Sequence, residues 1–299
     1  MRAKIMLLTA NKRDEETAAW AEQVLIDLSA AFDHSFSLMR GKIGEGLTDE
    51  TEEACQQCQA VFACDAGAEG VQDLYDALDL PLQIRCFSVP ESLCGRHEAP
   101  VSMYVGTVLS LDEETVRRAM RAAFWFSQEQ ECRLCVIPPN GASKAEWEAA
   151  ARVQEASQPQ ASSVTLSAPD AVAQMISAPE RMGLALCPPY AGSILLSAGM
   201  ALCSHPEIVH DAAFDEGCGV YAPYLVPEDE TPLPFSSALA VAKLLRYSLR
   251  LPREAACVEA AVNNVLSSRD GDMDAKRALE LICEQISVAG ELMQRSGIG

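Results

Sequence analysis

Short apolar runs alternate with longer amphipathic segments along this 299-residue chain. Runs such as residues 4–9 and 184–187 are too short for helices and are bounded by polar or turn-forming residues, which is typical of buried strands. Helical periodicity fills the stretches between such runs, most clearly at residues 113–128 and 239–249. Strands that alternate with helices predict an α/β protein built on a central mixed or largely parallel sheet.

The same patterns predict where the individual elements lie. Strands are expected at residues 4–9, 60–64, 82–88, 101–105, 134–137 and 184–187. Helices are expected at residues 15–31, 49–57, 113–128, 144–155, 170–177, 191–203, 239–249, 254–266 and 275–293. The Gln/Pro/Ser-rich stretch 156–163 is expected to be a loop.

Acidic residues outnumber basic ones by 43 to 23, which gives a formal net charge of −20. A surface of this sign repels phosphate backbones and anionic lipid, so the composition argues against binding to nucleic acid or to a membrane. The N-terminal apolar stretch is too short for a signal peptide, and no segment reaches the roughly 20 apolar residues of a membrane span. We therefore expect a cytoplasmic protein.

Twelve cysteines are scattered along the chain without secretory context, so they are expected to be reduced thiols that behave as small hydrophobic residues. The pairs Cys55/Cys58 and Cys132/Cys135 leave one alternative open, a four-thiolate zinc site. Cys55 and Cys58 fall where an expected helix runs into a strand, and Cys135 lies in another expected strand, rather than in the turns that zinc sites prefer. The pattern therefore favours structural thiols over zinc.

Two C-terminal stretches carry a likeness to a known family. Cys187-Pro-Pro-Tyr-Ala-Gly-Ser-Ile-Leu-Leu-Ser197 and Ala238-Leu-Ala-Val-Ala-Lys-Leu-Leu-Arg-Tyr-Ser-Leu249 resemble the C-terminal half of the isopropylmalate/isocitrate dehydrogenase family, the beta-decarboxylating dehydrogenases. Gly217-Cys-Gly-Val-Tyr-Ala-Pro223 extends this likeness, which is strong over residues 183–266 and faint before residue 140. Family members oxidise a 2-hydroxy acid with NAD(P) and Mg or Mn, and then decarboxylate it.

The resemblance implies the isopropylmalate dehydrogenase-like two-domain α/β fold. Residues 1–85 and 204–299 would form one discontinuous domain, and residues 86–203 would form an inserted domain. The family's inter-subunit arm would be deleted, because Tyr104 leads almost directly into a helix near Asp112. The inserted domain would carry the dimer interface, where the small and apolar residues of one helix would meet the partner: Ala191, Ile194, Leu195, Ala198 and Leu202.

Positions that match the family's functional residues have lost their chemistry. Ser193 and Ser197 stand where the family has two metal-binding aspartates. A neutral hydroxyl supplies neither the charge nor the affinity that Mg²⁺ or Mn²⁺ requires. Asp79 and Val89 occupy two positions of the arginines that bind the substrate carboxylate, and Arg85 lies nearby but out of register.

The remaining positions of the resemblance point the same way. Asn140 is all that is left of a motif whose lysine acts across the family's interface. Asp170 lies one residue from the position of the last metal aspartate, although a role as a helix-cap or first-turn acid explains it more simply. The turn at residues 10–16 has none of the family's three glycines, and the acids of 228–230 replace the loop that binds the NAD adenosine.

These losses predict no catalytic, cofactor-binding or metal-binding residues, and only remnant cleft positions: Arg85, Asn140, Asp170, Ser193 and Ser197. The function expected is that of a pseudoenzyme, a degenerate dehydrogenase-like scaffold or regulatory subunit that binds neither NAD(P) nor Mg/Mn. Its partner would be a second copy in a homodimer, or an active family member in a heteromer. The alternative is a divergent NAD-dependent oxidoreductase that acts on a 2-hydroxy acid such as 3-isopropylmalate.

Overall fold

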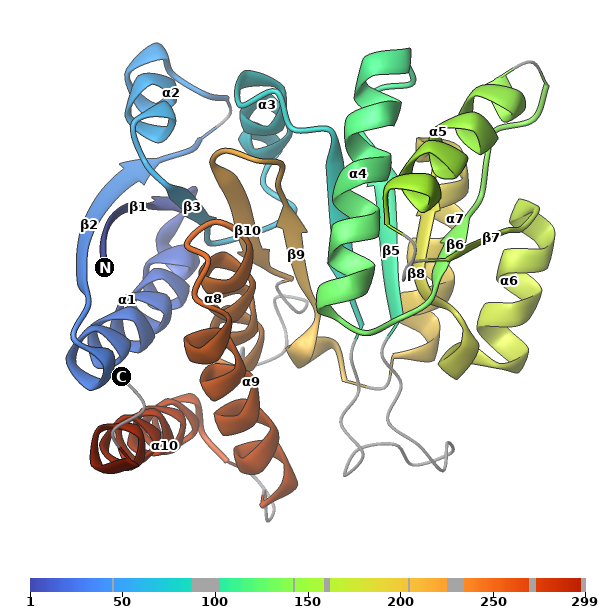
Figure 1. Ribbon diagram of the computed structural model, residues 1–299. Helices are drawn as coiled ribbons and strands as arrows, with labels where there is room; N and C mark the ends of the chain where they lie inside the picture. Colours follow the sequence, from blue (N-terminus) through green and yellow to red (C-terminus); the bar gives the residue numbers. More distant parts are fainter. Residues whose placement is uncertain are drawn as a thin grey trace. The chain divides into compact units, whose positions relative to one another are not determined.

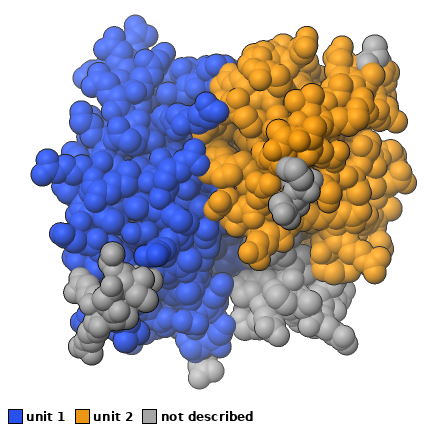
Figure 2. Space-filling model, in the orientation of Figure 1, with its two compact units in different colours: residues 1–79, 206–212, 216–299 blue, residues 80–205, 213–215 orange. Residues whose placement is uncertain are grey.

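The computed structural model describes residues 1–44, 46–87, 103–141, 143–158, 162–203, 205–224, 234–268 and 273–296. Two sequence-derived interpretations, on Val89 and on the acids Glu228–Glu230, lie outside the described residues. The chain forms two compact units, one of residues 1–79, 206–212 and 216–299 and one of residues 80–205 and 213–215 (Figures 1 and 2). The domain boundaries expected from the resemblance were residues 85/86 and 203/204.

Unit 1 contains strands that are largely buried, except for the half-exposed β2. Its strand order is β2-β1-β3-β10-β9, and β2/β1, β1/β3 and β3/β10 pair in parallel. The strands are β1 (Arg2–Thr9), β2 (Ser35–Lys42), β3 (Ala60–Ala63), β9 (His210–Ala213) and β10 (Gly219–Pro223). The helices are α1 (Lys12–Phe32), α2 (Asp49–Gln56), α3 (Glu69–Ala77), η3 (Pro206–Ile208), α8 (Phe235–Tyr247), α9 (Pro252–Ser267) and α10 (Ala275–Ser296).

Unit 2 adds an antiparallel pair to parallel strands. Its order is β4-β5-β8-β6-β7, in which β4/β5 is antiparallel and β5/β8, β8/β6 and β6/β7 are parallel. The strands are β4 (Leu82–Cys86), β5 (Met103–Val108), β6 (Leu134–Val136), β7 (Ser163–Thr165) and β8 (Gly183–Cys187). The helices are α4 (Glu113–Glu129), α5 (Ser143–Ser157), α6 (Ala168–Ser177), η2 (Pro179–Arg181) and α7 (Pro189–Leu202). The predicted α/β class with a mixed sheet is confirmed.

The elements that the sequence did not predict are short or half-exposed: β2, β7, β9, β10 and α3. Strand β2 alternates between exposed and half-buried residues, so it contains no continuous apolar run. The connection after β5 is short, which agrees with the expected loss of the inter-subunit arm. That strand ends at Val108, and Asp112 already caps α4 by accepting a hydrogen bond from Thr115 N at 2.9 Å. No described helix is long and apolar enough to cross a bilayer.

Side chains close the glycine-free turn between β1 and α1. Asp14 Oδ2 accepts hydrogen bonds from Ala10 N at 2.6 Å and from Asn11 N at 3.1 Å. In return, Asn11 Oδ1 accepts from Asp14 N at 3.3 Å. This reciprocal arrangement is a capping box at the start of α1, and it fixes the turn without the backbone freedom of glycine.

One glycine is required at the start of β8, because the chain there lies against another backbone segment. Gly183 has a φ of +59°, and a Cβ atom built on it would lie 2.2 Å from the carbonyl oxygen of Arg133. The same oxygen accepts a hydrogen bond from Leu184 N at 2.8 Å, so it cannot move away freely. Any larger residue would therefore disturb the entry to the central strand of unit 2.

We expect Gly183→Ala to lower the free energy of unfolding by about 4 kcal/mol, because a left-handed backbone and a steric overlap act together. Gly141→Ala is the matched control, since Gly141 has a φ of +91° but no atom within 4 Å of the position that an added methyl group would take. This control should cost only the backbone strain of about 1–3 kcal/mol. Urea denaturation measures both values, and equal losses would contradict a role for the overlap.

Candidate functional site

Four of the five expected site positions follow neighbouring parallel strands of unit 2. Asn140 comes after β6, Asp170 after β7, and Ser193 and Ser197 lie on α7 after β8. Because β8, β6 and β7 are adjacent and parallel, their carboxyl ends share one edge of the sheet. Ligand sites of α/β proteins form at such edges. The structure therefore brings these positions to the edge where a site would be expected.

Both serines of α7 are exposed, and each hydroxyl is used within the helix. Ser193 Oγ donates to the carbonyl oxygen of Tyr190 at 2.9 Å, and Ser197 Oγ donates to the carbonyl oxygen of Ser193 at 2.9 Å. Such bonds from a serine to the preceding turn are common in helices. The two positions, one turn apart, thus present neutral groups already bound to backbone.

Asp170 has the local role that the sequence favoured. Ser167 is the N-cap of α6, and its Oγ accepts a hydrogen bond from Asp170 N at 3.2 Å. The same hydroxyl donates to Asp170 Oδ2 at 2.5 Å. Asp170 is exposed and is an acid in the first turn, where the helix dipole favours negative charge. The interpretation as a helix-terminal acid is confirmed.

The other expected positions have structural settings of their own. Asn140 is exposed in the turn that precedes Gly141. Arg85 is half-buried on β4, opposite Val105 of β5. Asp79 directly follows the α3 C-cap with a φ of 49°, a left-handed conformation that Asp tolerates better than most residues.

The donor set does not fit a divalent metal. Among the described residues, no three His, Cys, Asp or Glu side chains are grouped so that they could hold an ion. Of the cysteine pairs considered for zinc, Cys55/Cys58 lies in unit 1 and Cys132/Cys135 in unit 2. Burial raises the pKa of Cys55 to about 12, which disfavours the thiolate that binds metal.

A buried ionic cluster in unit 1 is the first feature that sequence reasoning missed. Glu259 of α9 accepts hydrogen bonds from two residues of α8, from Lys243 Nζ at 3.0 Å and from Arg246 at 2.7 Å. Burial acts to raise the pKa of Glu259, but the two cations outweigh it and lower this pKa overall. A lysine within the apolar run Ala-Val-Ala-Lys-Leu-Leu was the available signal, since buried lysines need a partner.

His210 lies beside this cluster and is fully buried. Its Nδ1 is 2.9 Å from the carbonyl oxygen of Ile208, so the neutral ring carries its proton on Nδ1 and donates it there. Nε2 is buried, and no described residue bonds to it. Burial, and next the charge of Lys243, lower the pKa of His210 to about 3.

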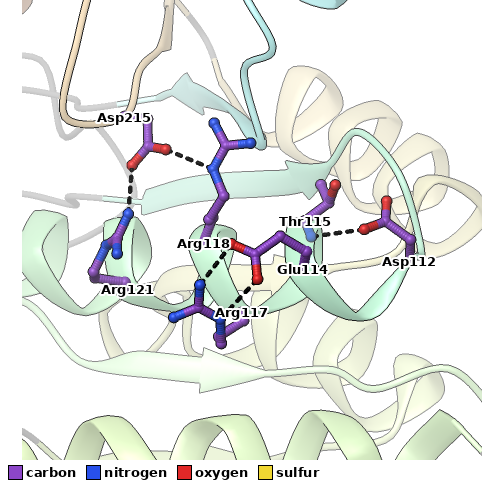
Figure 3. A network of polar contacts seen from close by, with 7 residues as sticks. All are labelled: Asp112, Glu114, Thr115, Arg117, Arg118, Arg121 and Asp215. Carbon is purple, nitrogen blue, oxygen red and sulfur yellow. Dashed lines mark hydrogen bonds and ion pairs between the residues drawn. The ribbon is translucent and has the colours of Figure 1, made fainter.

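An arginine clamp on α4 is the second missed feature (Figure 3). Arg118 Nε donates to Asp215 Oδ2 at 2.8 Å, and Arg121 donates to Asp215 Oδ1 at 3.2 Å. Phe214, the preceding residue, packs edge-on against Trp125 with ring centroids 5.3 Å apart. The clamp holds residues 213–215 against α4 within unit 2, and its cations are therefore committed to an internal carboxylate.

His210 should make the protein sensitive to acid. Its pKa is lower in the folded than in the unfolded state, so its contribution to stability is present above about pH 6.5 and is lost as the pH falls towards 3. Between pH 7 and about pH 4.5 we expect the wild type to lose about 2–3 kcal/mol more stability than His210→Asn, whose amide can still donate to Ile208. Urea denaturation at both pH values measures this difference. Equal losses of stability in the wild type and in His210→Asn would contradict this role of His210.

No protein-family model matches the sequence, and no curated protein matches it either. Solved structures do match. An isocitrate dehydrogenase from Methylococcus capsulatus aligns with a TM-score of 0.78 at 14% identity, over 95% of this chain and 99% of that one. A beta-decarboxylating dehydrogenase from Thermococcus kodakarensis, in its apo form, aligns with a TM-score of 0.78 at 14% identity, over 97% of this chain and 98% of that one. A protein from Thermus thermophilus aligns with a TM-score of 0.78 at 14% identity, over 95% of this chain and 68% of that one. The chain therefore has the isocitrate/isopropylmalate dehydrogenase-like fold.

Proposed function

We propose that this protein is a degenerate relative of the beta-decarboxylating dehydrogenases, a cytoplasmic pseudoenzyme that acts as a scaffold or regulatory subunit. The observation that carries the proposal is the state of Ser193 and Ser197. Both hydroxyls donate to carbonyl oxygens of their own helix, at 2.9 Å each. A metal site needs carboxylate oxygens at these positions, and neither serine can supply one.

Without a metal, the oxidation and decarboxylation carried out by the family that this chain resembles could not proceed. A divalent ion polarises the substrate oxygen and stabilises the charge that develops during decarboxylation. Asp170, at the carboxyl edge of unit 2, is likewise engaged locally through its bond from Ser167. Binding to a protein partner is the role that requires none of the lost groups.

The face of α7 is the surface that we propose for this partner, either a second copy or an active dehydrogenase. Tyr190 is 47% exposed and Ile194 is 53% exposed on this helix. The expected interface was too broad, however, because Ala191 and Leu195 are buried in the core of unit 2. A charge at position 195 would therefore damage the fold, and Ile194 is the better probe of association.

We expect isothermal titration calorimetry with Mn²⁺, NAD and 3-isopropylmalate to show no mutually dependent binding. Ser193→Asp/Ser197→Asp restores two carboxylates one helical turn apart, and it should bind Mn²⁺ at least about tenfold more tightly than the wild type. An enzyme assay on 3-isopropylmalate, isocitrate, malate and tartrate completes the test. Turnover by the wild type would overturn the proposal and support the alternative, a divergent NAD-dependent oxidoreductase.

Ile194→Asp should dissociate the assembly, because association would bury an unpaired carboxylate in an apolar contact. We expect the affinity between subunits to fall at least about 100-fold, since a loss near 3 kcal/mol corresponds to that factor. Val153→Asp on α5 is the control, as Val153 is 61% exposed but lies on another helix. Light scattering and sedimentation measure the mass of the assembly. A wild-type protein that stays monomeric, both alone and when mixed with active dehydrogenases, would contradict this interface.

A further inference from the structure

Strand β2 is the edge strand of unit 1, and it is long for an edge. It pairs with β1 over eight consecutive residues, from Arg2↔Ser35 to Thr9↔Lys42, without a break in register. No described strand pairs with its other side. The strand Ser-Phe-Ser-Leu-Met-Arg-Gly-Lys contains no proline and no bulge, two of the devices that natural edges use to prevent pairing, and its cations Arg40 and Lys42 lie in its second half.

Two backbone hydrogen bonds establish which residues of β2 point outwards. Ser35 N donates to Met1 O at 2.9 Å, and Ile43 N, just past the strand, donates to Thr9 O at 3.0 Å. The N–H and C=O of one strand residue point to the same side and alternate along the chain. Odd-numbered residues therefore bond to β1, and the even-numbered ones have their backbone groups on the free edge.

The free edge is limited to three residues. Lys42 is covered in part, because its carbonyl oxygen accepts from Thr51 Oγ1 of α2 at 3.3 Å. Phe36, Leu38 and Arg40 remain, with three N–H and three C=O groups directed away from β1. Three alternate residues centred on Leu38 form a set that can be placed opposite itself.

We propose that β2 pairs antiparallel with β2 of a second copy of this chain, about a two-fold axis at Leu38. In this register Leu38 faces Leu38 of the second copy, and Phe36 faces Arg40, so all six groups of each copy can be bonded. An isologous contact of this kind is closed, because each copy offers the same patch.

Side chains and charges are compatible with this pairing. No two cations face each other, since Arg40 lies opposite Phe36 and Ser37 opposite Met39. Within its own copy, Arg40 also forms ion pairs with Glu15 and Glu22 of α1. The net charge of −20 on each copy opposes association at long range. Salt screens this repulsion over a Debye length of about 8 Å at 0.15 M, so association should strengthen as salt is added.

The test separates this contact from that of α7 by using Ile194→Asp as the background in every sample. Amide hydrogen exchange is measured at low and high protein concentration, in full-length protein. We expect the amides of Phe36, Leu38 and Arg40 to become protected as concentration rises, whereas those of Ser37 and Met39 are protected throughout. Rapid exchange of the three even-numbered amides at all concentrations would overturn the proposal.

Leu38→Pro and Leu38→Ala form the matched pair of variants. Proline removes the outward N–H without removing a bond to β1. Alanine removes the same side chain but keeps that N–H. We expect Leu38→Pro to weaken self-association at least about tenfold relative to Leu38→Ala, since two central hydrogen bonds are lost. Sedimentation measures the self-association of both variants, and equal affinities would refute pairing through this edge. The thermal unfolding transition of each variant checks that it is folded.

Discussion

Unit 1 depends on the neutralisation of one lysine inside a buried helix. Every residue of α8 except Arg246 is buried, because the helix packs against α1, α9, β3 and β10. Lys243 lies in the middle of that helix with 5% of its side chain exposed, and removing a charge from water costs several kcal/mol unless a partner compensates. Glu259 of α9 supplies the partner, which ties the position of α9 to that of α8. Burial, and next the charge of Lys243, lower the pKa of His210, so the ring beside the cluster is neutral.

Helix α7 of unit 2 depends on close approach rather than on charge. A Cβ atom on Gly192 would lie 2.5 Å from Thr107 Oγ1, and one on Gly199 would lie 2.9 Å from the ring of Phe87. These two glycines, seven residues apart, share one face of α7 and let it pack closely on Thr107 of β5 and on Phe87, the residue after β4. The small residues of this helix are thus needed by the fold of a single copy. Ala191 and Leu195, also buried, belong to this internal contact and not to a partner.

The sequence was informative where burial produces periodic patterns and uninformative where it does not. Buried strands such as β1 and β8 were predicted because their apolar runs are continuous, whereas β2 was missed because its alternating exposure resembles a loop. The role of Asp170 could be predicted, since a serine three residues earlier is a local signal for a cap. The clamp on Asp215 could not be, because Arg118 is 97 residues away in the chain and only the fold joins them.

These packing constraints explain which positions around α7 match the dehydrogenase motif and which differ from it. Positions that match the family motif, Cys187 and Gly192 among them, are buried or in close contact, so most substitutions there would cost several kcal/mol. Ser193 and Ser197 lie on the exposed face of the same helix, where a change from carboxylate to hydroxyl costs the fold little. Packing alone therefore explains why Gly192 matches the family motif while the exposed Ser193 and Ser197 do not.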